Sequence, residues 1–150
     1  MGRSTVGLVQ ACVALAPVVY AVDTWEGTPN EPDHAKAIAQ LAPGETLFNK
    51  FYDNVQRAAC EDYIFPVKRR SQQAALMFEQ RSLDFCFIDG DHSFEAVTHD
   101  LNAFLPLMRP NRMLAGHDYY WGEVHLAVTK FAKQHNFQTK TVGDSWWFIV

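Results

Sequence analysis

Acidic and imidazole side chains follow two apolar runs of the sequence, 83–88 and 112–116, at the point where each run ends. Five such side chains stand at these two positions: Asp89, Asp91, His92, His117 and Asp118. A short apolar run that stops at charged residues is typical of a buried parallel strand, and the carboxyl ends of such strands bind ligands in open α/β sheets. The two runs therefore predict neighbouring strands whose ends build one polar site.

The residue types in this site indicate metal and proton chemistry. Asp89 and Asp118 could share one divalent ion, since Mg²⁺ prefers oxygen ligands and usually takes one or two carboxylates. His92 lies three residues after Asp89, on the first turn of a predicted helix, where it could accept a substrate proton because a histidine ordinarily titrates near neutrality. The two histidines also leave Zn²⁺ open, although no closed Cys/His site is visible. In the simpler alternative, Asp91 caps the helix and the histidines are ordinary polar residues at strand ends.

Two further positions could bind a nucleotide. Asp23 ends the apolar run 18–22 about 20 residues after Gly2, which is where doubly wound nucleotide-binding folds hold ribose hydroxyls. The alternative is that Asp23 only caps the loop that follows it. Ser71 could bond to a ligand base, or it could be a plain N-cap of the helix that begins there. Aromatic side chains that also follow strand ends could line a pocket for a flat or apolar substrate: Trp25, Tyr119, Tyr120 and Trp121.

Hydrophobic periodicity and turn residues supply the elements that would position these groups. Helices are expected at 2–16, 33–42, 45–59, 71–79, 93–107 and 123–135. Strands are expected at 18–22, 64–68, 83–88 and 112–117, with a loop at 24–32, a turn at 109–111 and a terminal hairpin formed by 137–142 and 146–150. This alternation predicts one α/β domain over 1–150, with a doubly wound, mostly parallel sheet and an antiparallel hairpin at its edge.

The composition excludes some classes of function. The 150 residues carry a net charge of -4, so there is no basic face for nucleic acid. The apolar runs are shorter than the roughly 18 residues that span a membrane, and no signal peptide is evident. The three cysteines have no metal-type spacing, which favours free thiols in a reducing compartment and a cytoplasmic protein.

Three motifs resemble class I S-adenosylmethionine-dependent methyltransferases. They are Tyr-Ala-Val-Asp-Thr-Trp-Glu-Gly at 20–27, Ile-Asp-Gly-Asp-His-Ser-Phe-Glu-Ala-Val at 88–97 with Asp-Leu at 100–101, and Leu-Ala-Gly-His-Asp-Tyr at 114–119. The group they resemble most carries IDGDHSYEAV and GGxLAGHDY signatures and includes O-methyltransferases of macrolide sugars and relatives of cephalosporin hydroxylase. The resemblance covers residues from about 2 to 131, and it implies a Rossmann-like methyltransferase sheet that ends in a hairpin.

The resemblance also implies roles for particular residues. It places the ribose of S-adenosylmethionine on Asp23 and the adenine near Ser71 and Gln72. The full set expected around the cofactor is Gly2, Asp23, Trp25, Ser71, Gln72 and Asp89. In metal-dependent members, acids that match Asp89 and Asp118 bind Mg²⁺, and a histidine that matches His92 is the base for the acceptor hydroxyl. The residue before the second acid is a third metal-binding acid in those members and is a histidine here, so the expected metal set is Asp89, His117 and Asp118.

The expected function is therefore methylation of a hydroxyl group on a small molecule. A metal-dependent hydrolase that uses the same acids and histidines stays open as an alternative, as does an inactive fragment or binding module. The resemblance further implies that the chain is truncated at its N-terminus, because only residues 2–5 match the glycine-rich cofactor loop and the first strand before it is missing. Strand edges left unpaired by such a gap would favour a homo-oligomer.

Overall fold

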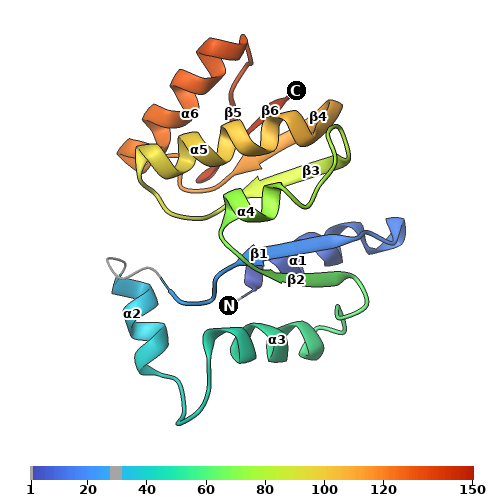
Figure 1. Cartoon of the computed structure of the whole chain (residues 1–150), viewed down its shortest axis with the longest axis vertical. Coiled ribbons are helices and arrows are strands. Elements are labelled where there is room, and N and C mark those ends of the chain that lie inside the picture. Colours follow the sequence, from blue (N-terminus) through green and yellow to red (C-terminus); the bar gives the residue numbers. More distant parts are fainter. Residues whose placement is uncertain (1, 28–31) are drawn as a thin grey trace. The chain divides into compact units, whose positions relative to one another are not determined.

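The computed structural model describes residues 2–27 and 32–150, and the chain divides into two compact units, Met1–Arg70 and Ser71–Val150 (Figure 1). The elements of the first unit are α1 Arg3–Cys12, the 3₁₀ helix η1 Val13–Leu15, β1 Val19–Asp23, α2 Pro32–Ala39, α3 Leu47–Arg57 and β2 Ile64–Lys68. Those of the second are α4 Ser71–Ala75, β3 Leu83–Ile88, α5 Phe94–Phe104, the 3₁₀ helix η2 Leu105–Leu107, β4 Met108–Gly116, α6 Gly122–His135, β5 Lys140–Val142 and β6 Ser145–Ile149.

The first unit is built on a two-stranded parallel sheet in which β1 pairs with β2. Helix α3 presents Leu47, Phe51 and Val55 to its core, because residues four apart lie on one helical face. Thr46 begins this helix with a capping box, in which its hydroxyl accepts the amide N–H of Asn49. The β1–β2 pair ends at Asp23, which is thereby held at the carboxyl end of the sheet.

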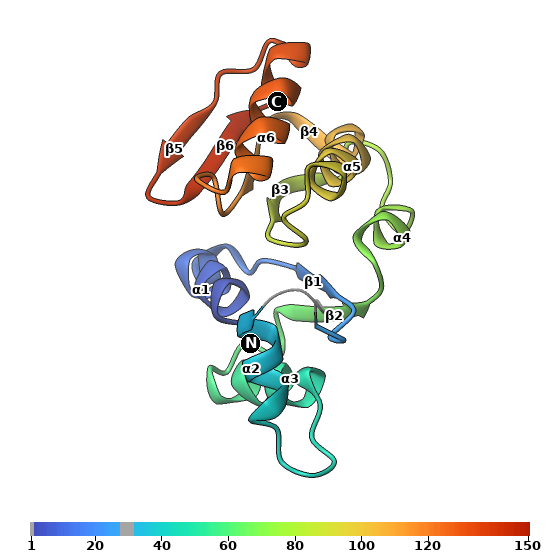
Figure 2. The same ribbon diagram turned by 90° about the vertical axis from the view of Figure 1, so that its left-hand side faces the viewer.

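The second unit contains a four-stranded sheet in the order β3-β4-β6-β5. Strands β3 and β4 are parallel, whereas β6 runs antiparallel to both β4 and β5. Helices α5 and α6 share one core with this sheet, and Figure 2 shows the two helices next to each other. Its fully buried members include Leu101 and Val128 from the helices and Leu114, Trp146 and Phe148 from the strands. The core sits directly beneath the ends of β3 and β4, where the candidate site lies.

The mixed α/β architecture is the predicted one, with a parallel β3–β4 pair and a terminal antiparallel hairpin. Most predicted elements occur within a few residues of their expected bounds, although α4 ends at Ala75 rather than at 79. The loop expected over 24–32 falls partly on residues 28–31, which lie outside the described residues. Within the described ranges, every helix is too short or too polar to span a bilayer.

The predicted turn at 109–111 falls inside β4, which begins at Met108, and the pairing of β4 with β3 is irregular there, since Met108 lies opposite Leu83 and Met113 lies opposite Phe85. The amide N–H of Asn111 donates to the carbonyl of Val150 at 2.5 Å, and the amide N–H of Val150 donates to the carbonyl of Arg112 at 3.0 Å. Asn111 adopts a left-handed backbone with φ 61°, a conformation that asparagine tolerates better than most residues. The end of the chain therefore joins this irregular stretch to the sheet.

Candidate functional site

The polar residues that follow β3 and β4 lie side by side in the second unit. The strands are parallel neighbours with Ile88 opposite Gly116, so Asp89 and His117 come next to each other. The backbone of His117 is fixed on both sides, because its N–H donates to the Ile88 carbonyl at 3.1 Å and its carbonyl accepts the Trp146 indole N–H at 3.0 Å. The sheet thus holds the start of the polar segment rigidly.

Asp118 is the centre of this cluster. Its Oδ2 atom lies 3.0 Å from Nε2 of His92 and 3.2 Å from Nδ1 of His117. The same His117 nitrogen lies 4.0 Å from Oδ1 of Asp89. Asp118 has a left-handed backbone with φ 55°, which turns the chain immediately after His117. One carboxylate therefore lies between two imidazoles, and a second carboxylate lies close by.

The donor atoms of Asp89, His117 and Asp118 fit a divalent cation. One ligand atom from each lies within 4.8 Å of the other two, so small side-chain movements would bring all three onto one ion. The side chains are 40%, 42% and 25% exposed, respectively, which leaves room for water or substrate oxygens to complete a coordination shell. The site lies over a small hollow whose floor is formed by Ile88, Val97, Val124 and Trp146.

Asp91 is turned away from this cluster into the start of α5. Its Oδ1 accepts the amide N–H of Ser93 at 2.8 Å, and hydrogen bonds from Ser93 hold the pKa of Asp91 below its usual value. The Ser93 hydroxyl in turn accepts the amide N–H of Ala96 at 3.3 Å and serves as the N-cap. The N-cap is therefore Ser93 and not Asp91, whose carboxylate instead fixes the backbone just before the helix.

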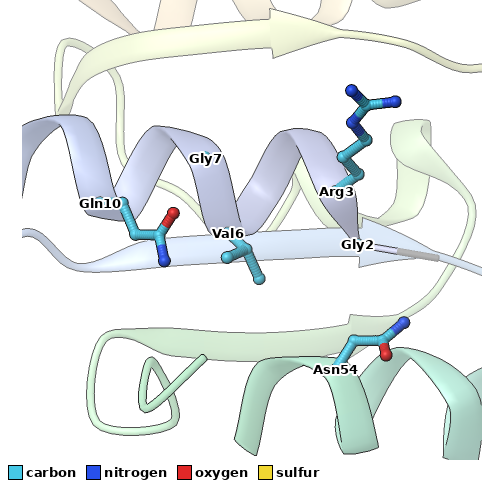
Figure 3. A pocket seen from close by; sticks show the side chains of 6 residues that line it. All are labelled: Gly2, Arg3, Val6, Gly7, Gln10 and Asn54. Carbon is cyan, nitrogen blue, oxygen red and sulfur yellow. The ribbon is translucent and has the colours of Figure 1, made fainter. Parts of the chain in front are cut away.

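Three of the residues expected around the cofactor belong to the first unit. Gly2 caps α1 with φ 75° and lines a cavity of about 500 Å³ along that helix, which Asn54 of α3 also lines (Figure 3). A Cβ atom on Gly2 would lie 2.8 Å from the Phe51 ring, so glycine is required there. Asp23 is exposed and its Oδ1 accepts the amide N–H of Trp25 at 2.8 Å, while the Trp25 ring is buried in the core.

The other three expected residues belong to the second unit, where Asp89 follows β3 and Ser71 and Gln72 begin α4. Gln72 is exposed, whereas the Ser71 hydroxyl donates to Oδ1 of Asp100 at 2.5 Å. Asp100 is only 9% exposed, and burial raises its pKa above the usual value. The sequence includes this acid in one of the three motifs without indicating its role, although its position between Val97 and Leu101 on the inward face of α5 was a usable signal of burial.

Replacing Asp100 with asparagine is expected to make the free energy of unfolding less sensitive to pH. The raised pKa means that the folded protein holds this proton more tightly than the unfolded chain, so wild-type stability falls as pH rises from about 4, the ordinary Asp value. Asparagine cannot ionise, yet its amide oxygen can still accept the Ser71 hydroxyl. Urea unfolding at pH 4, 5.5 and 7 measures this. The free energy of unfolding of the variant should rise relative to that of the wild type as the pH rises.

The matched control for this experiment is Asp84→Asn. Hydrogen bonds from Arg112 and Arg109 lower the pKa of Asp84, so the stability that its charge contributes is lost only as pH falls below about 4, the ordinary Asp value, and the difference between Asp84→Asn and the wild type should stay nearly constant from pH 5.5 to pH 7. A constant stability difference between Asp100→Asn and the wild type at all three pH values would contradict the assignment of a buried, proton-holding carboxyl.

Comparison with known proteins gives matches in sequence and in fold. A family model described as a methyltransferase domain matches residues 1–119. The fold is similar to that of CalS11, a calicheamicin methyltransferase, with 11% identity, a TM-score of 0.67 and coverage of 99% of this chain and 68% of that one. It is also similar to the O-methyltransferase NovP, with 12% identity, a TM-score of 0.63 and coverage of 97% and 64%.

A third structure, from Staphylococcus aureus and provisionally assigned as a caffeoyl-CoA O-methyltransferase, gives 12% identity, a TM-score of 0.61 and coverage of 100% of this chain and 85% of that one. At such identities the structural likeness shows a shared fold. A comparison with curated proteins gave no significant match.

Proposed function

Because the chain belongs to the methyltransferase-domain family, as its motifs predicted, we propose that it transfers the methyl group of S-adenosylmethionine to a hydroxyl of a small molecule. The observation that carries the hydroxyl assignment is the contact of His92 with Asp118 beside His117 and Asp89. A hydroxyl is a poor nucleophile until it loses its proton, and this cluster combines a base with groups that could bind the oxygen. The family match favours methyl transfer over the hydrolase alternative.

In this proposal His92 is the general base. The Asp118 carboxylate at 3.0 Å orients the imidazole, while Trp121 packs against the ring with the centroids 5.0 Å apart. S-adenosylmethionine would supply the methyl group and leave as S-adenosylhomocysteine, with the electron pair of the broken carbon–sulfur bond on sulfur, while His92 would take the proton of the acceptor hydroxyl. Catalysis would come mainly from holding the two reactants in line.

Asp89, His117 and Asp118 are the residues that would hold a divalent metal ion. A bound ion would lower the pKa of the acceptor hydroxyl and orient its oxygen. Asp89 and His117 would fix its position from the ends of two adjacent strands, and Asp118 would connect it to the base through their shared contact with His92.

The cofactor would be recognised largely by residues outside the metal cluster. Asp23 is exposed at the end of β1, where a carboxylate can accept hydrogen bonds from two adjacent ribose hydroxyls. Ser71 and Gln72 would lie by the adenine, and the backbone at Gly2 would lie by the methionine part of the cofactor. Trp25 would act indirectly, since its buried ring supports the segment after Asp23.

The decisive experiment combines binding and product analysis. The full chain should bind S-adenosylmethionine in isothermal titration, and methyl-labelled cofactor should give a labelled methyl ether with a panel of small phenols, sugars and other alcohols. S-adenosylhomocysteine should compete with the cofactor in both measurements. Binding accompanied by label only on nitrogen or carbon acceptors would contradict the hydroxyl assignment, and no binding at all would contradict the cofactor assignment.

A further inference from the structure

One of the three candidate metal ligands is a nitrogen. The cluster offers two carboxylate oxygens, from Asp89 and Asp118, together with Nδ1 of His117. A second imidazole nitrogen, Nε2 of His92, contacts the same Asp118 oxygen at 3.0 Å. The carboxylate is therefore flanked by two nitrogen donors, which differs from the all-oxygen environment that suits Mg²⁺.

The imidazole of His117 lies beside both carboxylates, on a backbone that is fixed in the sheet. The backbone N–H and carbonyl are both hydrogen-bonded, to Ile88 and to the Trp146 indole, and Trp146 is 1% exposed. The imidazole of a residue fixed on both backbone sides can turn only about its side-chain bonds, and it already lies 3.2 Å from Asp118 and 4.0 Å from Asp89. An ion that accepts both carboxylates therefore meets this nitrogen as well.

We infer that this cluster selects a first-row transition ion of the Co²⁺ or Zn²⁺ class over Mg²⁺, an inference that rests on the metal site of the proposed function. Imidazole suits such ions, whereas Mg²⁺ takes oxygen ligands and gives up its water reluctantly. The selecting residue is His117, because a carboxylate in its place would make the cluster an all-oxygen site. The metal preference of the cluster does not depend on which acceptor is methylated.

The test is a metal titration of the chelator-treated full chain, with His117→Asp as the informative variant. Any N/O site prefers transition ions to some degree, so the measured quantity is the ratio of Co²⁺ affinity to Mg²⁺ affinity by isothermal titration. In His117→Asp this ratio should fall by about 10-fold or more, because one imidazole ligand is exchanged for oxygen. The added negative charge strengthens the binding of both divalent ions and so largely cancels in the ratio.

Co²⁺ also gives a direct spectroscopic readout. The visible absorption bands of Co²⁺ bound to the wild type should change position or intensity in His117→Asp and stay unchanged in His99→Gln, which removes an exposed imidazole of α5. An unchanged affinity ratio in His117→Asp, or wild-type Mg²⁺ binding as tight as Co²⁺ binding, would overturn the inference. Cofactor titration of the same samples reports separately on the proposed function, which stands if S-adenosylmethionine binds and methyl transfer occurs.

Discussion

Replacing His92 with glutamine is expected to lower kcat for methyl transfer by about 10²- to 10⁴-fold, the usual contribution of a general base. Glutamine can still donate a hydrogen bond to Oδ2 of Asp118, which lies 3.0 Å from the wild-type nitrogen, but it cannot accept a proton at neutral pH. Initial rates of product formation give kcat, and isothermal titration should show unchanged affinity for S-adenosylmethionine.

A metal titration separates a base from a metal ligand. Metal affinity should stay within a few-fold of the wild type if His92 is the base, whereas loss of a ligand would weaken it. His99→Gln, on the exposed side of α5, is the matched control and should keep the wild-type kcat. A kcat retained in His92→Gln would contradict the role of this residue as the base.

The arrangement of the site could be predicted from the sequence where local pattern determines it. The apolar runs that stop at Asp89 and at His117 indicate two strands, and parallel pairing of neighbouring strands brings their ends together. Helix α5 can also be predicted from local sequence, because its N-cap Ser93 comes directly before it and the apolar residues Val97 and Leu101 are spaced four apart within it. These features need only the alternation of polar and apolar residues over a few turns.

Contacts between distant residues could not be predicted in this way. Ser71 and Asp100 are 29 positions apart, and the residues around each of them do not indicate that the two side chains form a hydrogen bond. The amide N–H of Asn111 donates to the carbonyl of Val150, a residue that is also distant in the sequence. Likewise, no local pattern indicates that Asp118 has a left-handed backbone and contacts both histidines. Such features depend on how helices and strands pack against one another once they have formed.

Gly116 is another residue whose importance comes from a distant partner, and its replacement with alanine is expected to lower the free energy of unfolding by about 3 kcal/mol, the upper part of the usual range for overpacking. A Cβ atom there would lie 2.3 Å from Cζ2 of Trp146 and 2.6 Å from the carbonyl oxygen of Ile88. The indole cannot easily move away, because it is buried and its N–H is bonded to the carbonyl of His117. The ends of β3 and β4 would have to separate. Urea unfolding of variant and wild type measures the loss.

Two companion variants identify the cause of that loss. Gly122→Ala, at the start of α6, meets nothing within 4 Å and should leave stability unchanged or raise it by about 0.5–1 kcal/mol, since alanine suits a helix better than glycine. The double variant Gly116→Ala with Trp146→Phe should be less destabilised than the sum of the two single changes, because the smaller ring removes part of the clash. Strict additivity, or a Gly116→Ala protein as stable as the wild type, would contradict the close approach of Trp146. Because the same indole holds the carbonyl of His117, the Gly116→Ala protein should also bind Co²⁺ more weakly.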